Sequence, residues 1–77
     1  MTKADDVVTY MIMKKRAAFT KPEQRLMEDL GFDSLELTQL ALDFESIADI
    51  VISDEDIAHW RTVADVIKTI ERALTNA

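Results

Sequence analysis

Hydrophobic side chains recur at steps of three and four along the chain, and this period is typical of helices with one buried face. The first such stretch covers residues 3–16 and has four apolar side chains on one face: Ala4, Val8, Met11 and Ile12. Its last turn carries three basic side chains that complement the helix dipole: Lys14, Lys15 and Arg16. Residues 3–16 are therefore predicted to form the first helix.

The second stretch, residues 34–48, carries a denser apolar face. Its predicted core residues are Leu37, Leu40, Ala41, Phe44 and Ala48, with Ile47 beside them. Leu35 and Leu42 lie seven residues apart on a different stripe, where a surface helix normally has polar residues. From the pattern alone, two interpretations carry similar weight. These leucines are either isolated exposed residues, which are ordinary, or an apolar strip that faces a partner and is bordered by Glu36, Asp43 and Glu45.

Two further helices are predicted after residue 53. Ser53 is expected to cap a short third helix with Asp56 at its third position, and Thr62 to cap the last helix with Asp65 at the same place. The residues expected to be buried here are Ile57, Trp60, Val63, Val66, Ile67, Ile70, Ala73 and Leu74. Before them, the sequence Ile50-Val51-Ile52 has strand-like composition but no second strand to pair with, so it is interpreted as a loop that packs inward.

A long connection, residues 17–33, separates the first two helices. Its apolar residues can anchor it to the core: Phe19, Leu26, Met27, Leu30 and Phe32. The sequence Thr20-Lys21-Pro22-Glu23 has the spacing of a capping box, which predicts a short helical turn over residues 21–28. Gly31, the one glycine of the chain, is expected to adopt a positive φ and redirect the chain into the second helix.

Together these elements predict an all-α fold, a small four-helix bundle with three longer helices, one short third helix and a long loop between the first two. Residues 1–77 are expected to form a single domain, because 77 residues suit one small core. One glycine and one proline leave few turn residues for a β fold. The sequence has no cysteine, so any thiol in its function must come from a cofactor.

The sequence Asp33-Ser34-Leu35-Glu36 is predicted to begin the second helix with a capping box. Asp33 would accept a hydrogen bond from the amide of Glu36, and Glu36 would accept one from the amide of Asp33. Ser34 then occupies the first helical position with its hydroxyl unused. A free serine oxygen beside the positive end of a helix is a suitable place for a phosphate ester.

The residues Asp29-Leu30-Gly31-Phe32-Asp33-Ser34-Leu35 resemble the prosthetic-group site of the acyl carrier protein family, and the resemblance extends over residues 5–75. It implies that Ser34 carries a 4′-phosphopantetheine arm, with Asp33 and Leu35 beside it. The arm comes from coenzyme A through a separate phosphopantetheinyl transferase. A protein of this kind tethers acyl or aminoacyl groups as thioesters and is not an enzyme. The resemblance also suggests that an acyl chain could shelter in a space between helices lined by Leu37, Leu40, Phe44, Ile52 and Ile57, although core packing explains the same residues.

Charge is unevenly distributed along the chain, whose formal net charge is −6. Residues 26–60 contain no lysine or arginine and ten acidic residues. This stretch is either an ordinary solvated surface or a docking face for partners with basic patches. With the resemblance, the residues expected to contact partners are Leu35, Glu36, Leu42, Asp43 and Glu45. The acidity argues against nucleic acid and anionic membranes. No membrane span or signal peptide is visible, so a cytoplasmic location is expected. The chain is also expected to be a monomer.

Other sites are not favoured by the sequence. His59 is the one histidine and lacks partners for a zinc or catalytic set, and residues 49–56 lack the calcium-loop order. No metal or catalytic residue is therefore predicted. The competing hypothesis is a cofactor-free acidic helical interaction module.

Two features bear on the cargo. Gln39, Ser46 and Ile47 stand where fatty-acid carriers tend to have acids, which favours a specialised carrier for polyketide, peptide or another acyl product. The sequence Trp60-Arg61-Thr62 faintly resembles D-alanyl carrier proteins, so an aminoacyl cargo stays open.

Overall fold

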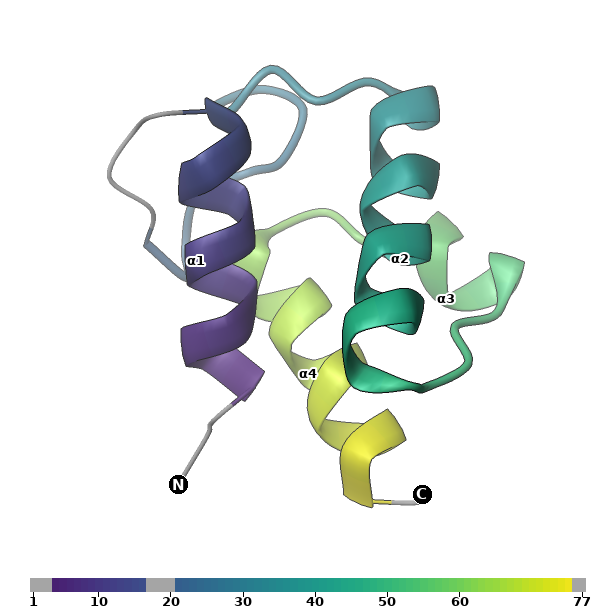
Figure 1. Ribbon diagram of the computed structural model, residues 1–77. Coiled ribbons are helices and arrows are strands. Elements are labelled where there is room, and N and C mark those ends of the chain that lie inside the picture. The colour runs from purple at the N-terminus through teal and green to yellow at the C-terminus, as the bar shows by residue number, and fades with distance from the viewer. Residues whose placement is uncertain (1–3, 17–20, 76–77) are drawn as a thin grey trace.

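The computed structural model describes residues 4–16 and 21–75. This part of the chain forms four helices, which are α1 (Ala4–Arg16), α2 (Ser34–Ala48), α3 (Asp54–Ala58) and α4 (Val63–Thr75). Figure 1 shows α1 and α2 side by side and running in opposite directions, with α4 packed against α1 and the short α3 on the outer side of α2. The predicted all-α bundle with a short third helix is confirmed. Residue 3, Phe19 and Thr20 lie outside the described residues.

One hydrophobic core joins α1, α2, α4 and the connection before α2. Its largest fully buried side chains are Val8, Ile12, Leu26, Leu40, Phe44, Val63, Val66 and Ile70. The short helix α3 has no fully buried residue of its own. It packs through the partly buried Ile57 and is ion-paired to α4 through Asp56 and Arg72. Two residues after it, the buried Trp60 donates a hydrogen bond from Nε1 to Thr69 Oγ1 at 2.9 Å. Trp60 is therefore a core anchor, as the sequence predicted.

The predicted caps of α3 and α4 are confirmed. Ser53 Oγ accepts a hydrogen bond from the amide of Asp56 at 3.1 Å. Thr62 and Asp65 form a reciprocal pair, because the Asp65 amide donates to Thr62 Oγ1 at 3.3 Å and the Thr62 amide donates to Asp65 Oδ2 at 3.0 Å. The helix α2 ends at Asp49, which has the left-handed conformation that aspartate tolerates at such positions (φ 56°).

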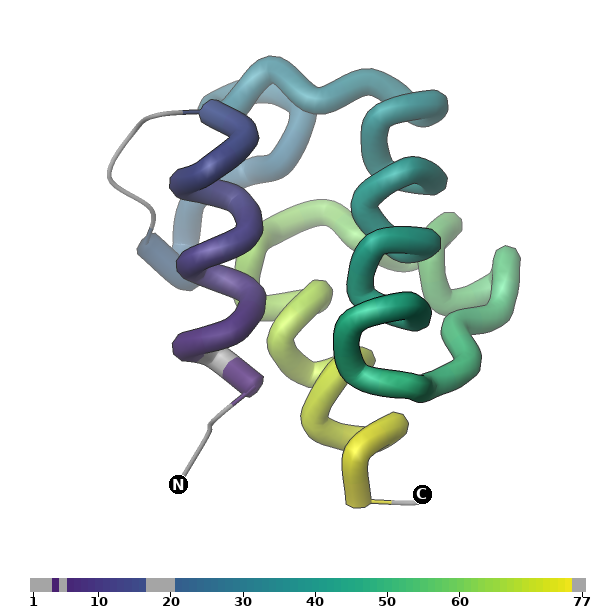
Figure 2. The backbone as a smooth tube through the Cα atoms, in the orientation of Figure 1, coloured from purple at the N-terminus to yellow at the C-terminus, as the bar shows by residue number. Residues whose placement is uncertain are grey.

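The connection from residue 21 to residue 33 passes over the end of the bundle where α1 ends and α2 begins (Figure 2). The helical turn predicted over residues 21–28 does not form a helix, since this segment consists of non-helical turns. Its backbone is bonded to the start of α4 instead. The amide of Leu26 donates to the carbonyl of Arg61 at 2.8 Å, and the amide of Val63 donates to that of Gln24 at 3.0 Å.

Four apolar residues expected in the core are exposed. Met27 is half exposed because it follows the fully buried Leu26 in a turn and its side chain leaves the core. Ile47 is 61% exposed, since it lies four residues after the ion-paired Asp43 and shares that flank of α2. Val51 is 85% exposed between the buried Ile50 and Ile52, which is the alternation of an extended segment. Leu74 is partly exposed in the last turn of α4.

The described residues contain neither a membrane-spanning helix nor a metal-binding cluster. None of their helices combines the length and the apolar character needed to cross a bilayer. Their His, Asp and Glu side chains form no group of three or more that could hold a metal ion.

Candidate functional site

The candidate site is built on the turn that leads into α2. Gly31 has φ of 74°, as the sequence predicted, and its amide donates to the carbonyl of Met27 at 3.1 Å. The next amide, of Phe32, donates to the carbonyl of Leu26 at 2.9 Å, and the Phe32 ring is buried. The positive φ at Gly31 and the buried ring at Phe32 therefore fix the direction in which the chain enters α2.

The first turn of α2 has the predicted capping box. Asp33 has extended backbone angles, and its Oδ1 accepts a hydrogen bond from the amide of Glu36 at 2.8 Å. In return, Glu36 Oε1 accepts one from the amide of Asp33 at 3.1 Å. The Asp33 carboxylate is thus the N-cap of α2, and the side chain of Ser34 is not needed for capping.

Ser34 is exposed at the first position of α2. Its hydroxyl has no hydrogen-bond partner within residues 4–16 and 21–75, and its carbonyl accepts a bond from Thr38 Oγ1 at 3.1 Å. Within the same residues, the amides of Ser34 and Leu35 have no acceptor. Leu35 itself is 81% exposed. The site therefore combines an accessible hydroxyl with two unused amide donors at the positive end of a helix.

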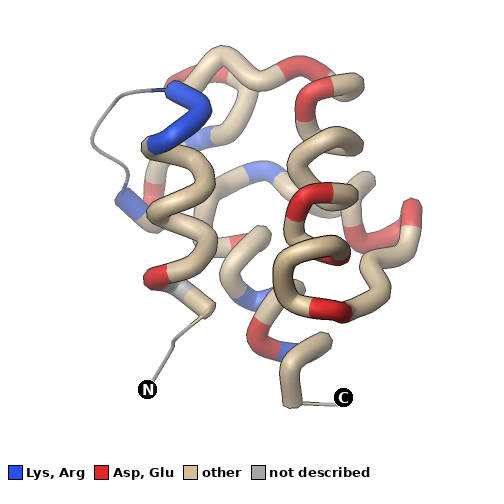
Figure 3. Tube along the Cα trace, in the orientation of Figure 1, with Lys and Arg blue, Asp and Glu red and all other residues tan. Residues whose placement is uncertain are grey.

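Two ion pairs join the end of α1 to α2 next to this turn. Arg16 Nη2 lies 2.7 Å from Glu36 Oε2, and Lys15 Nζ lies 2.8 Å from Asp43 Oδ2. Figure 3 shows the basic last turn of α1 at the same end of the bundle as the acidic first turn of α2. The hydrogen bond from Arg16 lowers the pKa of Glu36, and the amide of Asp33 adds to this effect. The hydrogen bond from Lys15 lowers the pKa of Asp43 in the same way.

A cleft of about 360 Å³ opens beside Ser34, between the start of α2 and α3. Its lining residues are Met27, Ser34, Leu37, Thr38, Asp54, Ile57, Ala58 and Trp60. Of the residues proposed from the sequence as an acyl shelter, Leu37 and Ile57 line this cleft. Leu40, Phe44 and Ile52 are buried in the core and do not line the cleft, and Leu37 is itself largely buried. The cleft is thus an open surface feature next to the hydroxyl.

Comparisons with known proteins show the family to which the chain belongs. Residues 14–70 match the family model described as the phosphopantetheine attachment site. An acyl carrier protein of Thermotoga maritima is 42% identical over 52 residues, which are 68% of this chain. The chain belongs to the acyl carrier protein family. Its covalent cofactor is accordingly phosphopantetheine, and the family consists of carriers and not of catalysts.

Further relatives of the family agree with this assignment. An acyl carrier protein of Exiguobacterium is 44% identical over 52 residues, or 68% of this chain. The aligned region is 64% of the Thermotoga protein and 66% of the Exiguobacterium protein, which is just under two thirds of each. A solved structure of an acyl carrier protein from Mycobacterium tuberculosis superposes with a TM-score of 0.80 at 33% identity, covering 87% of this chain and 93% of that one. These likenesses favour the carrier over the cofactor-free interaction module.

The residues predicted to contact partner proteins differ in exposure and in whether their side chains already have partners within the chain. Leu35 and Leu42 are exposed, at 81% and 52%. The three acids are already engaged within the chain, since Glu36 and Asp43 are ion-paired with α1 and Glu45 Oε2 accepts a hydrogen bond from the amide of Ile52 at 2.7 Å. Leu35 and Leu42 are therefore the fully available members of the set, while the three acids are only partly exposed.

The sequence pattern did not identify Lys15 and Arg16 as part of the site. Both were interpreted only as basic residues that complement the helix dipole. Their partners on α2 lie about 20 residues or more away along the chain, so the local pattern does not show them. Met27 was also missed, since an apolar residue in a connection is normally read as a core anchor. A basic helix end followed by an acidic helix start is the one signal that could have suggested the ion pairs.

Acid is expected to destabilise the fold. Five carboxyl groups have a lowered pKa: Asp29, Glu36, Asp43, Asp56 and Asp65. Because each pKa is lower in the folded chain, the unfolded chain binds more protons at low pH. The stabilisation is complete above the unfolded pKa values of about 4 and is lost as the pH falls through the folded ones. Below the isoelectric point of about 4.5, growing positive charge adds to the loss.

Urea unfolding followed by circular dichroism at steps of pH would measure this effect. We expect the free energy of unfolding to fall steadily from about pH 4.5 to pH 3. The double variant Glu36→Gln, Asp43→Asn should show a shallower fall, because two of the five groups are removed. A fold that became more stable between pH 4.5 and 3 would contradict the prediction.

Proposed function

We propose that Ser34 carries the 4′-phosphopantetheine arm and that the chain tethers acyl or aminoacyl groups on it, delivering them to partner enzymes. The observation that carries this proposal is the accessible hydroxyl of Ser34, which has no hydrogen-bond partner in the described part of the chain and lies inside the matched attachment region. The arm supplies a thiol, which the chain itself lacks, and holds the cargo as a thioester.

The residues around Ser34 suit a phosphodiester. The free amides of Ser34 and Leu35 can donate to its oxygens at the positive end of α2. Two neighbouring carboxylates would otherwise repel it. However, Asp33 is occupied as the helix cap and Glu36 is paired with Arg16, so the local negative charge is reduced.

The attachment step is a substitution at phosphorus. Ser34 Oγ forms a bond to the phosphorus that carries pantetheine, and the bond from that phosphorus to the rest of coenzyme A breaks. The leaving phosphate keeps the electron pair, and the hydroxyl proton passes to a base of the phosphopantetheinyl transferase. An exposed serine with no competing hydrogen bond is ready for this attack.

We further propose that partner enzymes dock on α2 next to Ser34. Leu35 and Leu42 would fill apolar contacts, while the outer surfaces of Glu36, Asp43 and Glu45 would face basic groups. Docking brings the tethered cargo to each active site as a partly intramolecular reactant, which raises its effective concentration. The expected partners are the transferase and the enzymes that load and process the cargo.

Two features bear on the nature of the cargo, namely the exposed residues of α2 and the cleft beside Ser34. Gln39, Ser46 and Ile47 are all exposed on α2 where fatty-acid carriers tend to be acidic, which supports a specialised acyl or aminoacyl cargo. The cleft beside Ser34, lined by Leu37 and Ile57, is a place where an apolar cargo could rest. A monomeric state and a cytoplasmic location stay predictions.

Incubation with coenzyme A and a broad-specificity phosphopantetheinyl transferase tests the proposal. Intact-mass spectrometry should show the gain of one phosphopantetheine, and fragmentation should locate it on the peptide that contains Ser34. An unchanged mass, or attachment at another residue, would overturn the proposal.

A further inference from the structure

We propose that Arg16, at the end of α1, is a positioning residue that holds the turn before Ser34 in the geometry required for attachment of the arm. This inference rests on the proposed function of Ser34. Arg16 lies 18 residues earlier in the sequence and contacts four residues of the segment that surrounds the serine, which are Leu30, Gly31, Phe32 and Glu36.

The first set of contacts is to the backbone of the turn. Arg16 Nε donates to the carbonyl of Leu30 at 2.8 Å, and Nη2 donates to the carbonyl of Gly31 at 3.3 Å. These two carbonyls lie on either side of the Gly31 Cα atom, where the positive φ changes the direction of the chain. A single side chain therefore fixes the orientation of two successive peptide groups just before α2.

The second contact is to the capping box. Arg16 Nη2 also lies 2.7 Å from Glu36 Oε2, while the other oxygen of the same carboxylate accepts the amide of Asp33. Glu36 thereby links the guanidinium to the residue that precedes Ser34. Because a hydrogen bond to a charged group is stronger and shorter than a neutral one, this link restrains the first turn of α2.

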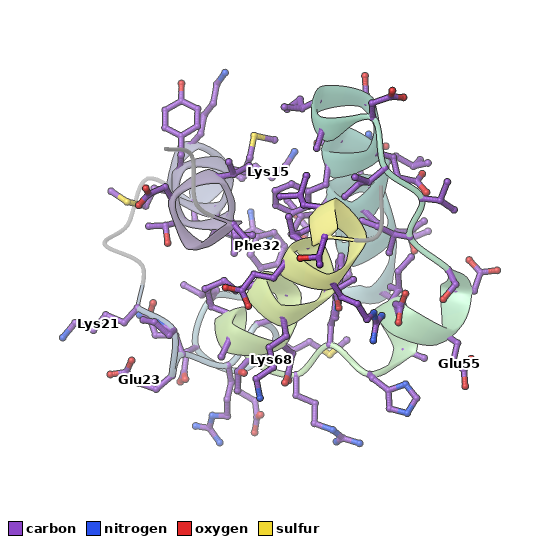
Figure 4. All side chains as sticks on the ribbon, turned by 90° about the horizontal axis from the view of Figure 1, so that it is seen from below. Lys15, Lys21, Glu23, Phe32, Glu55 and Lys68 are labelled. Carbon is purple, nitrogen blue, oxygen red and sulfur yellow. The ribbon has the colours of Figure 1, made fainter. Side chains whose placement is uncertain are left out.

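The third contact is to an aromatic ring. The guanidinium carbon of Arg16 lies 4.1 Å from the centre of the Phe32 ring, which is buried. This cation–π contact holds the guanidinium plane over a rigid part of the core. Figure 4 shows Phe32 and the neighbouring Lys15 on the side of α1 that faces α2.

Arginine is the one residue type that can make all of these contacts at once. Its planar guanidinium has five donors in a fixed arrangement and stacks on aromatic rings, whereas a lysine ammonium is a single point charge on a flexible chain. The side chain of Arg16 is also only 24% exposed, so these interactions are partly shielded from solvent. The arrangement is therefore specific for arginine and differs from the neighbouring ion pair of Lys15.

Lys15 offers a matched control. It is the adjacent cation on α1 and also forms an ion pair with α2, at Asp43. Among the described residues, none of its hydrogen bonds or ion pairs involves residues 30–33. Loss of Lys15 should therefore weaken the contact of α1 with α2 without releasing the turn.

The test compares Arg16→Met, Arg16→Lys and Lys15→Met in steady-state attachment assays with coenzyme A and the transferase. Because small displacements of a reacting atom have large effects on rate, we expect Arg16→Met to lower kcat/KM about tenfold, mainly through kcat. Arg16→Lys should recover a minor part of the loss, and Lys15→Met should change kcat/KM less than about threefold. Circular dichroism would first establish that each variant is folded under the assay conditions.

Backbone hydrogen exchange gives a second readout that does not depend on the transferase. If Arg16 positions the turn, Arg16→Lys should speed exchange at the hydrogen-bonded amides of Gly31, Phe32, Asp33 and Glu36 and leave the amides of α4 unchanged. This milder variant also decides the question if Arg16→Met does not fold. Uniformly faster exchange throughout the chain would mean a general contribution to stability and would overturn the proposal.

Several kinetic outcomes would also overturn it. These are an unchanged kcat/KM in Arg16→Met, an equal loss in Lys15→Met, or a change confined to KM, which would mean that Arg16 contacts the transferase. If the unsubstituted chain itself accepts no arm, the proposed function fails, and the exchange measurement still decides the role of Arg16 in the turn.

Discussion

Replacement of Ser34 by alanine is expected to abolish phosphopantetheine attachment completely and to leave the fold unchanged. The substitution removes the attacking oxygen, so no partial activity can remain at this position. Ser34 is exposed and its hydroxyl makes no hydrogen bond within the described residues, and alanine has the higher helix propensity. We therefore expect the free energy of unfolding to change by less than about 0.5 kcal/mol.

Intact-mass spectrometry after incubation with coenzyme A and the transferase measures the loss, and urea unfolding measures the stability. Ser46→Ala is a suitable control, since Ser46 is also an exposed serine on α2. That variant should gain one phosphopantetheine at the rate of the unsubstituted chain. A mass gain in Ser34→Ala, or a loss in Ser46→Ala, would show that the arm is attached elsewhere.

The largest effect on stability is expected for Phe44→Ala. Phe44 is fully buried on the inner face of α2, and truncation of a buried phenylalanine to alanine costs about 3–5 kcal/mol. A domain of 77 residues has a total stability of about 4–12 kcal/mol. The substitution thus removes a large part of the stability and should lower both the urea midpoint and the melting temperature markedly.

Urea and thermal unfolding followed by circular dichroism would measure this loss. Leu42→Ala is the matched control, because Leu42 is also an apolar residue of α2 but is 52% exposed, and its truncation should change stability by less than about 0.5 kcal/mol. If both variants had the same stability, α2 would bury a different face from the one described.

Those features of the site that depend on local sequence were predictable. The spacing of Asp33 and Glu36 fixes the capping box, and the lone Gly31 marks the positive φ, because both depend on residues close together in the chain. The buried face of α2 followed from its period for the same reason.

Features that depend on residues far apart in the sequence were not predictable. The exposure of Met27 and Ile47 depends on which elements pack nearby, and their hydrophobicity gives no information about it. The contacts of Arg16 with residues 30–36 join two elements across a long connection, and the basic helix end was fully explained by the dipole alone. A single sequence has no pattern that distinguishes a cation at a helix end from one that supports a functional turn.

The backbone bonds between residues 24–26 and residues 61–63 have a consequence for biosynthesis. A nascent chain that has released the Ser34 segment but not yet residue 63 lacks the partner to which the preceding connection is bonded. Ser34 therefore reaches its final setting only after the start of α4 has left the ribosome. Loading of the arm on a nascent chain would then wait for residues 61–63, and a fragment that ends before them would lack the bonds that hold the connection in front of Ser34.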